Sequence, residues 1–153
     1  MENRTYAYPL QKDVMKRRIV LDTNCLVSSL PRKGKYYQVW QDFFAGKYTL
    51  CYTNEILTEY EEILTQKMGK MIAQNVVKAI IARPNTLKLD PHFRFQLISQ
   101  DLDDNKFVDC AIVANAQYIV TEDKHFNVLS EIDFPKVDVI NLDTFLTLLL
   151  QDM

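Results

Sequence analysis

The feature of this sequence that most constrains its fold is a short apolar run that ends in an acid. It spans residues 17–24 and reads RRIVLDTN. A β-branched and aliphatic run that stops at polar residues is typical of a buried strand followed by a loop. In open α/β sheets, ligands bind outside the carboxyl ends of the strands. Asp22 is therefore a candidate functional residue, although Asp22 or Asn24 could instead only cap the next helix.

Strand-like and helix-like segments alternate along the rest of the chain. Short apolar runs predict strands at 19–22, 48–52, 86–89, 118–121 and 137–140. Apolar residues at helical spacing predict helices at 36–44, 56–68, 71–82, 107–114 and 143–150. Thr53 and Asn54 offer a cap for the second of these helices, and Gly46 fits the end of the first. This order is typical of an α/β protein.

The length of the chain favours one domain. Its 153 residues can bury most of their apolar surface around one core and are too few for two ordinary domains. Residues 1–16 show no clear period, and we interpret them as an N-terminal arm or extension before a domain at 17–153. No apolar stretch approaches the roughly 20 residues of a membrane helix, and the start lacks the apolar core of a secretory signal. We therefore expect a cytoplasmic protein without membrane contact.

Cysteine usage agrees with this location. The three cysteines are widely spaced in apolar sequence, which favours reduced thiols in a core over disulfides or a zinc site: Cys25, Cys51 and Cys110.

The charge balance limits how this chain could bind nucleic acid. Its formal net charge is −2, so binding to a polyanion must come from local basic patches. Two patches are candidates, although each could be solvated surface: Lys12, Lys16, Arg17 and Arg18, and then Arg32, Lys33 and Lys35. The aromatic residues beside the second patch are Tyr36, Tyr37 and Trp40. They could stack on bases, but their helical spacing favours positions in the core over base stacking.

Acidic residues recur where predicted elements begin or end. Three acids precede the helix at 107–114, namely Asp101, Asp103 and Asp104. A helix cap needs only one acid. Three acids this close repel one another unless solvent, a cation or a raised pKa reduces the repulsion. The strand at 118–121 ends before Glu122 and Asp123. On the helix at 56–68, Glu59 and Glu61 flank the apolar stripe, and helix geometry does not choose between them.

Converging carboxylates without His or Cys neighbours suit Mg²⁺ or Mn²⁺, which bind through a few carboxylates and substrate phosphates. Such ions can stabilise both oxygens of an in-line phosphodiester displacement. The sequence has no rival motif, because a Gly-rich phosphate loop, a GxSxG elbow and a GxGxxG fingerprint are all missing from it.

Four stretches of the sequence together resemble PIN-domain ribonucleases, and within them the branch of toxins from toxin-antitoxin pairs. They are LDTN at 21–24, NEILTEYEEIL at 54–64, DLDDNKF at 101–107 and IVTEDK at 119–124. They occur in the family's order and spacing between about residues 18 and 145. The resemblance implies a three-layer α/β/α sandwich around a parallel sheet, with a quartet of acids that binds a divalent metal ion.

Matching the motifs residue by residue assigns roles to particular positions. The resemblance implies that the catalytic and metal-binding acids are Asp22, Glu59, Asp104 and Asp123, with Asp103 as an alternative to Asp104. It chooses Glu59 over Glu61, which helix geometry had left equal. Matching polar positions in the same motifs are Thr23, Asn24 and Thr121. We expect the contacts to nucleic acid from Arg32, Lys33, Lys35 and Lys124.

The last motif departs from the common pattern of this branch. Where relatives commonly read Thr-Gly-Asp-Lys-Asp, this chain has Thr121, Glu122, Asp123, Lys124 and His125. A histidine serves Mg²⁺ less well than a carboxylate and could shift the metal preference toward softer ions. We interpret His125 as a surface residue rather than as a contact to metal or phosphate. His92 lies outside every motif, and we interpret it as structural.

The predicted function is therefore a Mg²⁺- or Mn²⁺-dependent endoribonuclease that hydrolyses RNA phosphodiester bonds, as the toxin of a toxin-antitoxin pair. The expected partners are an RNA substrate, a cognate antitoxin protein and a second copy of the chain in a homodimer. The alternative is a PIN-fold protein with weakened catalysis that acts as an RNA-binding or partner-binding module.

Overall fold

The structure, a computed structural model, describes residues 17–99 and 101–151. The predicted arm at 1–16 lies outside the described residues, so the domain boundary stays a prediction. In chain order the elements are β1 (Arg17–Leu21), α2 (Thr23–Ser28), α3 (Tyr37–Phe44), β2 (Tyr48–Tyr52), α4 (Asn54–Met68), α5 (Lys70–Ala82), β3 (Thr86–Lys88), the 3₁₀ turn η1 (Leu102–Asp104), α6 (Asn105–Ala114), β4 (Tyr118–Val120), the 3₁₀ segment η2 (Lys124–Glu131), β5 (Val139–Ile140) and α7 (Leu142–Gln151).

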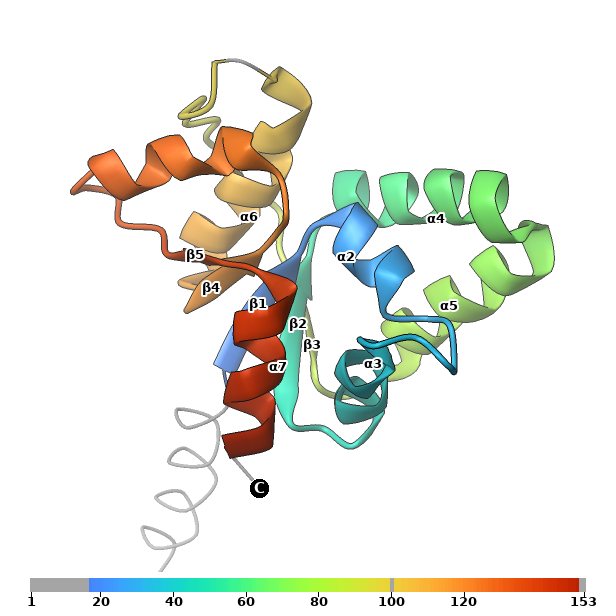
Figure 1. The fold of residues 1–153 in the computed structure, drawn as a ribbon. Helices are drawn as coiled ribbons and strands as arrows, with labels where there is room; N and C mark the ends of the chain where they lie inside the picture. Colours follow the sequence, from blue (N-terminus) through green and yellow to red (C-terminus); the bar gives the residue numbers. More distant parts are fainter. Residues whose placement is uncertain (1–16, 100, 152–153) are drawn as a thin grey trace, which may run out of the picture.

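The five strands form one parallel sheet in the order β3-β2-β1-β4-β5 (Figure 1). β1 lies at its centre, where Ile19 is in register with Leu50 of β2 and with Tyr118 of β4. The chain first adds strands on one side of β1 and then on the other. The topological switch point, where α/β sheets bind ligands, therefore lies between β1 and β4.

Helices cover both faces of this sheet. On one face, the ring of Tyr48 in β2 packs edge to face on Phe145 of α7, with centroids 5.1 Å apart, and α3 packs beside them. On the other face, α6 packs on β1, β2 and β4, and its Cys110 lies near Cys51 of β2. Side chains at positions 48 and 51 point to opposite faces because a strand alternates. The predicted three-layer α/β/α sandwich is confirmed.

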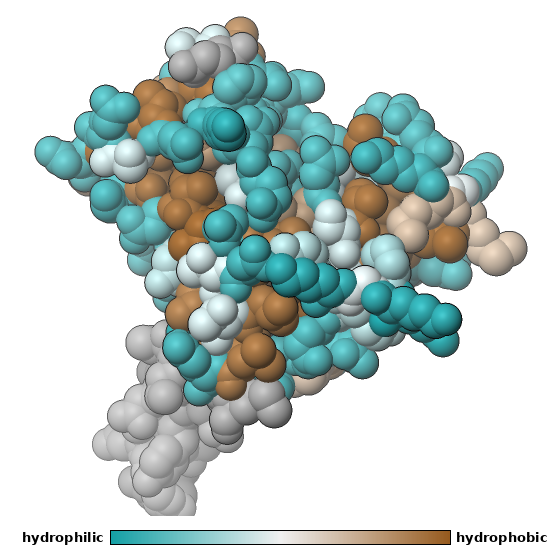
Figure 2. All heavy atoms as spheres, viewed as in Figure 1, coloured by the Kyte–Doolittle hydropathy of each residue, from teal (hydrophilic) through white to brown (hydrophobic). Residues whose placement is uncertain are grey.

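Burial follows from this layering. Ile19, Val20 and Leu21 are at most 1 % exposed, as expected for a central parallel strand covered on both faces. All three cysteines are buried and free, as the sequence predicts. Hydrophilic side chains dominate the outer surface in Figure 2, where hydrophobic residues gather over α7, the helix that carries the exposed Leu150. No helix of residues 17–99 and 101–151 has the length and apolarity needed to cross a bilayer.

Several helix ends lie where their local chemistry predicts. The Thr53 hydroxyl accepts a hydrogen bond from the backbone N–H of Ile56 at 3.2 Å, which caps α4. Gly46 follows α3 with φ of 75°, a backbone conformation that glycine adopts without strain. α5 ends at Arg83, which is extended because the next residue is Pro84.

Two helical segments were not predicted. α2 has only six residues and begins directly after the acid that follows β1. η2 is a 3₁₀ segment, whose three residues per turn do not give the apolar spacing of an α-helix. The first predicted strand, 19–22, was also placed too far along the chain: the observed strand ends at Leu21, so Asp22 lies just after β1.

Candidate metal centre

Asp22 lies at the carboxyl edge of the sheet, at the switch point. Its backbone N–H donates to the Val120 carbonyl of β4 at 3.0 Å, which fixes the residue between the two strands. It precedes α2 but makes no capping hydrogen bond with its side chain. Instead, its Oδ2 accepts from the Thr121 hydroxyl at 2.6 Å. Burial raises the pKa of Asp22 despite this hydrogen bond, and the charges of Glu59 and Asp123 raise it further.

Asp104 is the second buried acid at this edge. It occupies the cap position of α6, again without a capping hydrogen bond from its side chain. Its Oδ2 is buried and has no hydrogen-bond partner. Burial raises the pKa of Asp104 to about 7, and the charges of Asp101, Asp123 and Asp22 contribute, whereas His125 opposes the shift. Asp103, the predicted alternative, has a side chain that is 86 % exposed.

Glu59 faces the site from α4, whereas Glu61 on the same helix is exposed. Both oxygens of the Glu59 carboxylate have partners. Its Oε2 accepts from the Thr23 hydroxyl, and its Oε1 lies 2.7 Å from the Lys106 ammonium. Although burial disfavours a charged amine, Glu59 holds the pKa of Lys106 above its ordinary value. Lys106 was not predicted as a site residue, and its position two residues after the acidic stretch 101–104 was the available signal.

Asp123 and His125 complete the cluster from the segment after β4. The backbone N–H of Asp123 donates to the Thr121 hydroxyl at 3.0 Å, and Asp123 Oδ1 accepts from the backbone N–H of His125 at 2.9 Å. These bonds bring the His125 ring to the acids: its Nδ1 lies 3.4 Å from Asp123 Oδ1 and 3.6 Å from Asp104 Oδ2. His125 is exposed, as its interpretation as a surface residue expects, and its ring also lies close to two of the predicted metal ligands.

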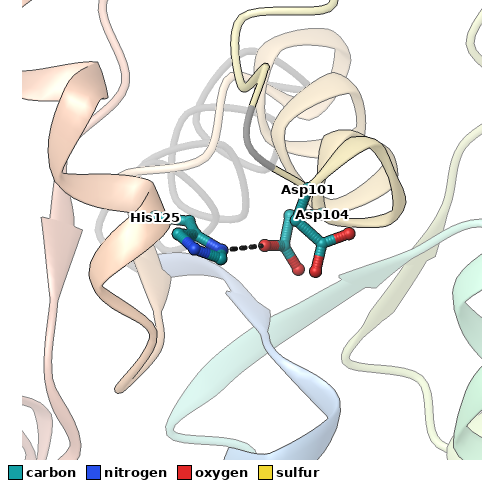
Figure 3. A group of neighbouring side chains, drawn as sticks. All are labelled: Asp101, Asp104 and His125. Atoms are coloured by element: carbon teal, nitrogen blue, oxygen red, sulfur yellow. Dashed lines mark ion pairs between the residues drawn. The ribbon is translucent and has the colours of Figure 1, made fainter.

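A compact group of potential metal ligands is formed by Asp101, Asp104 and His125, which point toward one another in Figure 3. One ligand atom of each lies within 4.8 Å of the others. Asp101 precedes the 3₁₀ turn η1, and its carbonyl accepts a hydrogen bond from the backbone N–H of Asp104 at 3.1 Å, which brings the two aspartates together. Sequence reasoning missed Asp101 as a ligand, although its spacing from Asp104 carried that signal. The buried Asp104 Oδ2, which accepts no hydrogen bond, fits a bound cation.

The predicted nucleic-acid residues do not join this cluster directly. Those predicted to contact RNA are exposed: Arg32, Lys33, Lys35 and Lys124. Lys35 and the Tyr36 hydroxyl both contact Asp143 Oδ1, each at 2.8 Å. Asn24 is also exposed.

In α3, Trp40 is partly buried against the core and stacks on Phe43 with centroids 5.3 Å apart, which supports the core interpretation for Trp40. A groove of about 490 Å³ lies along α4, and the pair of Glu59 and Lys106 belongs to its lining.

This fold and site define a class: an α/β protein whose acids meet at the switch point of a parallel sheet. Comparison with known families finds that the PIN domain matches residues 18–125. The chain therefore belongs to the PIN-domain family. A search of curated proteins returned no match.

Solved structures with a similar fold include three proteins of the VapC and VapBC group. VapBC2 from Rickettsia felis, bound to a DNA fragment from its promoter, is 18 % identical, with 81 % of this chain and 98 % of that chain covered and a TM-score of 0.56. DNA-bound VapBC from Salmonella typhimurium is 14 % identical, with coverage of 82 % and 98 % and a TM-score of 0.55. VapC20 from Mycobacterium tuberculosis, a toxin that cleaves the sarcin-ricin loop, is 14 % identical, with coverage of 71 % and 92 % and a TM-score of 0.53.

Proposed function

We propose that this protein is a divalent-metal-dependent endoribonuclease that hydrolyses RNA phosphodiester bonds. The observation that carries the proposal is the gathering of acids at the switch point, with one buried carboxylate oxygen of Asp104 left without a hydrogen bond. Carboxylates in such proximity raise one another's pKa values and are stabilised together by a cation. Acids that served only to stabilise the fold would not need to lie so close that their charges repel one another.

In this proposal the ion is held by the quartet Asp22, Glu59, Asp104 and Asp123. When bound, a divalent ion supplies Lewis-acid stabilisation of the charge on the attacking and leaving oxygens of the phosphodiester. Thr121 orients the Asp22 carboxylate by its 2.6 Å hydrogen bond, and Thr23 orients that of Glu59. These partners fix the acids before substrate arrives, which reduces the reorganisation needed in the reaction.

Cationic side chains have a second role in the proposal. Lys106 neutralises Glu59 and lines the groove along α4, where we propose that its ammonium contacts a substrate phosphate. Arg32, Lys33, Lys35 and Lys124 are proposed to contact the RNA backbone beyond the cluster, because phosphate contacts position a nucleic acid without reading its sequence.

We further propose that the chain acts as a toxin restrained by a partner protein, the antitoxin. The similarity of its fold to VapBC2, VapBC and the toxin VapC20 supports this assignment. A homodimer stays a prediction from the sequence resemblance.

The test is cleavage of a labelled structured RNA with Mg²⁺ or Mn²⁺, scored beside retention of the RNA. Wild type is expected to cut the RNA, and EDTA to stop it. Asp22→Asn should cut at least about 100-fold more slowly, because partners that merely orient metal ligands already cost up to that factor. RNA retention should persist, since the acids act on the transition state more than on ground-state affinity.

The matched control is Glu61→Gln, which removes an exposed acid from the same helix as Glu59 and should leave the rate unchanged. Equal cutting by wild type and Asp22→Asn would attribute the activity to a contaminant. RNA retention without any cutting by wild type would favour the binding module.

A further inference from the structure

The side chain of His125 has no role in the quartet proposed above, yet it is directed into the acidic cluster. Its Nδ1 lies 3.6 Å from Asp104 Oδ2, the buried oxygen without a hydrogen bond. That distance is too long for a hydrogen bond. Two ligand atoms on one ion, each about 2.1 Å from it, stand about 3–4 Å apart. The imidazole and the carboxylate are therefore spaced as ligands of a common ion.

Asp101 supplies a third ligand to the same point. One of its carboxylate oxygens lies within 4.8 Å of the ligand atoms of Asp104 and His125 (Figure 3). Asp104 is 9 % exposed, whereas the His125 side chain is 45 % exposed, so the group is closed on one side and open to solvent on the other. A bound ion can therefore enter and keep water molecules on its open side.

The backbone fixes this group before any ion binds. The N–H of His125 donates to Asp123 Oδ1, and the N–H of Asp103 donates to Asp101 Oδ1 at 3.1 Å. These two turns restrain the backbone next to His125 and Asp101. Preorganised ligands of mixed type favour some metals over others.

We propose that Asp101, Asp104 and His125 bind one first-row transition-metal ion through two carboxylates and one imidazole nitrogen, which makes the site selective for Mn²⁺ and its heavier neighbours over Mg²⁺. Imidazole suits transition metals, whereas Mg²⁺ prefers an all-oxygen set. The inference deepens the metal dependence proposed above and rests on it, because both assign Asp104 to the ion. It differs in adding Asp101 and a nitrogen ligand.

Pulsed electron paramagnetic resonance of Mn²⁺ bound to the full chain tests the nitrogen ligand without an activity measurement. Wild type should show hyperfine coupling to one imidazole nitrogen. His125→Gln should lose this coupling, and the matched control His92→Gln should keep it, because His92 is exposed and outside the cluster. Asp101→Asn should weaken Mn²⁺ binding by about 10-fold or more.

Metal preference is the second measurement. Titration of Mn²⁺-loaded protein with Mg²⁺, followed by the signal of released Mn²⁺, gives the ratio of the two affinities. His125→Asp restores an all-oxygen set and should shift that ratio toward Mg²⁺ by at least about 10-fold. Bound Mn²⁺ without nitrogen coupling in wild type would overturn this inference and leave the proposed nuclease intact. Failure of wild type to bind Mn²⁺ or Mg²⁺ at all would overturn both.

Discussion

Asp104→Asn is expected to stabilise the metal-free protein at pH 8 while lowering RNA cleavage at least about 100-fold. The pKa of Asp104 rises to about 7 in the folded protein, so between about pH 4 and pH 7 the folded state binds more protons than the unfolded state. Stability therefore falls as pH rises through this window. At pH 8 the buried charge is fully formed, and removing it should add about 1–2 kcal/mol to the free energy of unfolding, because solvent screens part of the repulsion.

Urea denaturation at pH 4.5 and pH 8 in metal-free buffer measures this effect. The gain from Asp104→Asn should appear at pH 8 and shrink at pH 4.5, where wild-type Asp104 is already protonated. The matched control is Asp133→Asn, which removes an exposed acid outside the cluster and should change neither stability nor cleavage appreciably. A loss of stability at pH 8 would identify Asp104 as a structural cap of α6.

Phe107→Ala is expected to lower the free energy of unfolding by about 3–5 kcal/mol, a large part of the roughly 5–15 kcal/mol that stabilises a domain. Phe107 is 1 % exposed, and its ring packs on Phe126 of η2 with centroids 6.5 Å apart. It therefore joins the start of α6, beside Asp104, to the segment that carries His125. A cavity at this contact would loosen both sides of the metal-ligand group.

Thermal or urea unfolding of Phe107→Ala measures the loss. Phe93→Ala serves as the control, because Phe93 is 75 % exposed and its removal should change stability by less than about 0.5 kcal/mol. Similar losses of unfolding free energy in both variants would show that buried Phe107 contributes no more to stability than exposed Phe93.

The sheet and most helices could be predicted because their signals are local. The apolar run at 19–21 and the capping hydroxyl of Thr53 act within a few residues of the chain, so the sequence displays them directly. α2 and η2 were missed because neither is long enough, or has the right period, to show an α-helical pattern. In the fold, α2 packs on α4, and η2 packs on β5 and, through Phe126, on α6.

The candidate site divides in the same way. The acids at the ends of strands follow from the rule that ligands bind at the carboxyl edge, and Asp22 and Asp123 were found by it. Lys106 was missed, and His125 was interpreted only as a surface residue, because the role of a single polar residue depends on a partner far away in the sequence. Lys106 meets Glu59 and His125 meets Asp104 only after α4, α6 and η2 have packed.

The hydrogen bond between Thr121 and Asp22 joins residues 99 positions apart, and β1 pairs with β4 on the same side. A chain emerging from the ribosome contains Asp22 and Glu59 long before β4 exists. Pairing between such distant segments is slow, because the entropy of closing the long loop is lost before the stabilising contact forms. The nascent protein therefore holds its first acids without the strand that orients them. The cluster assembles only when most of the chain has been synthesised, so translation itself sets the earliest moment at which this site can act.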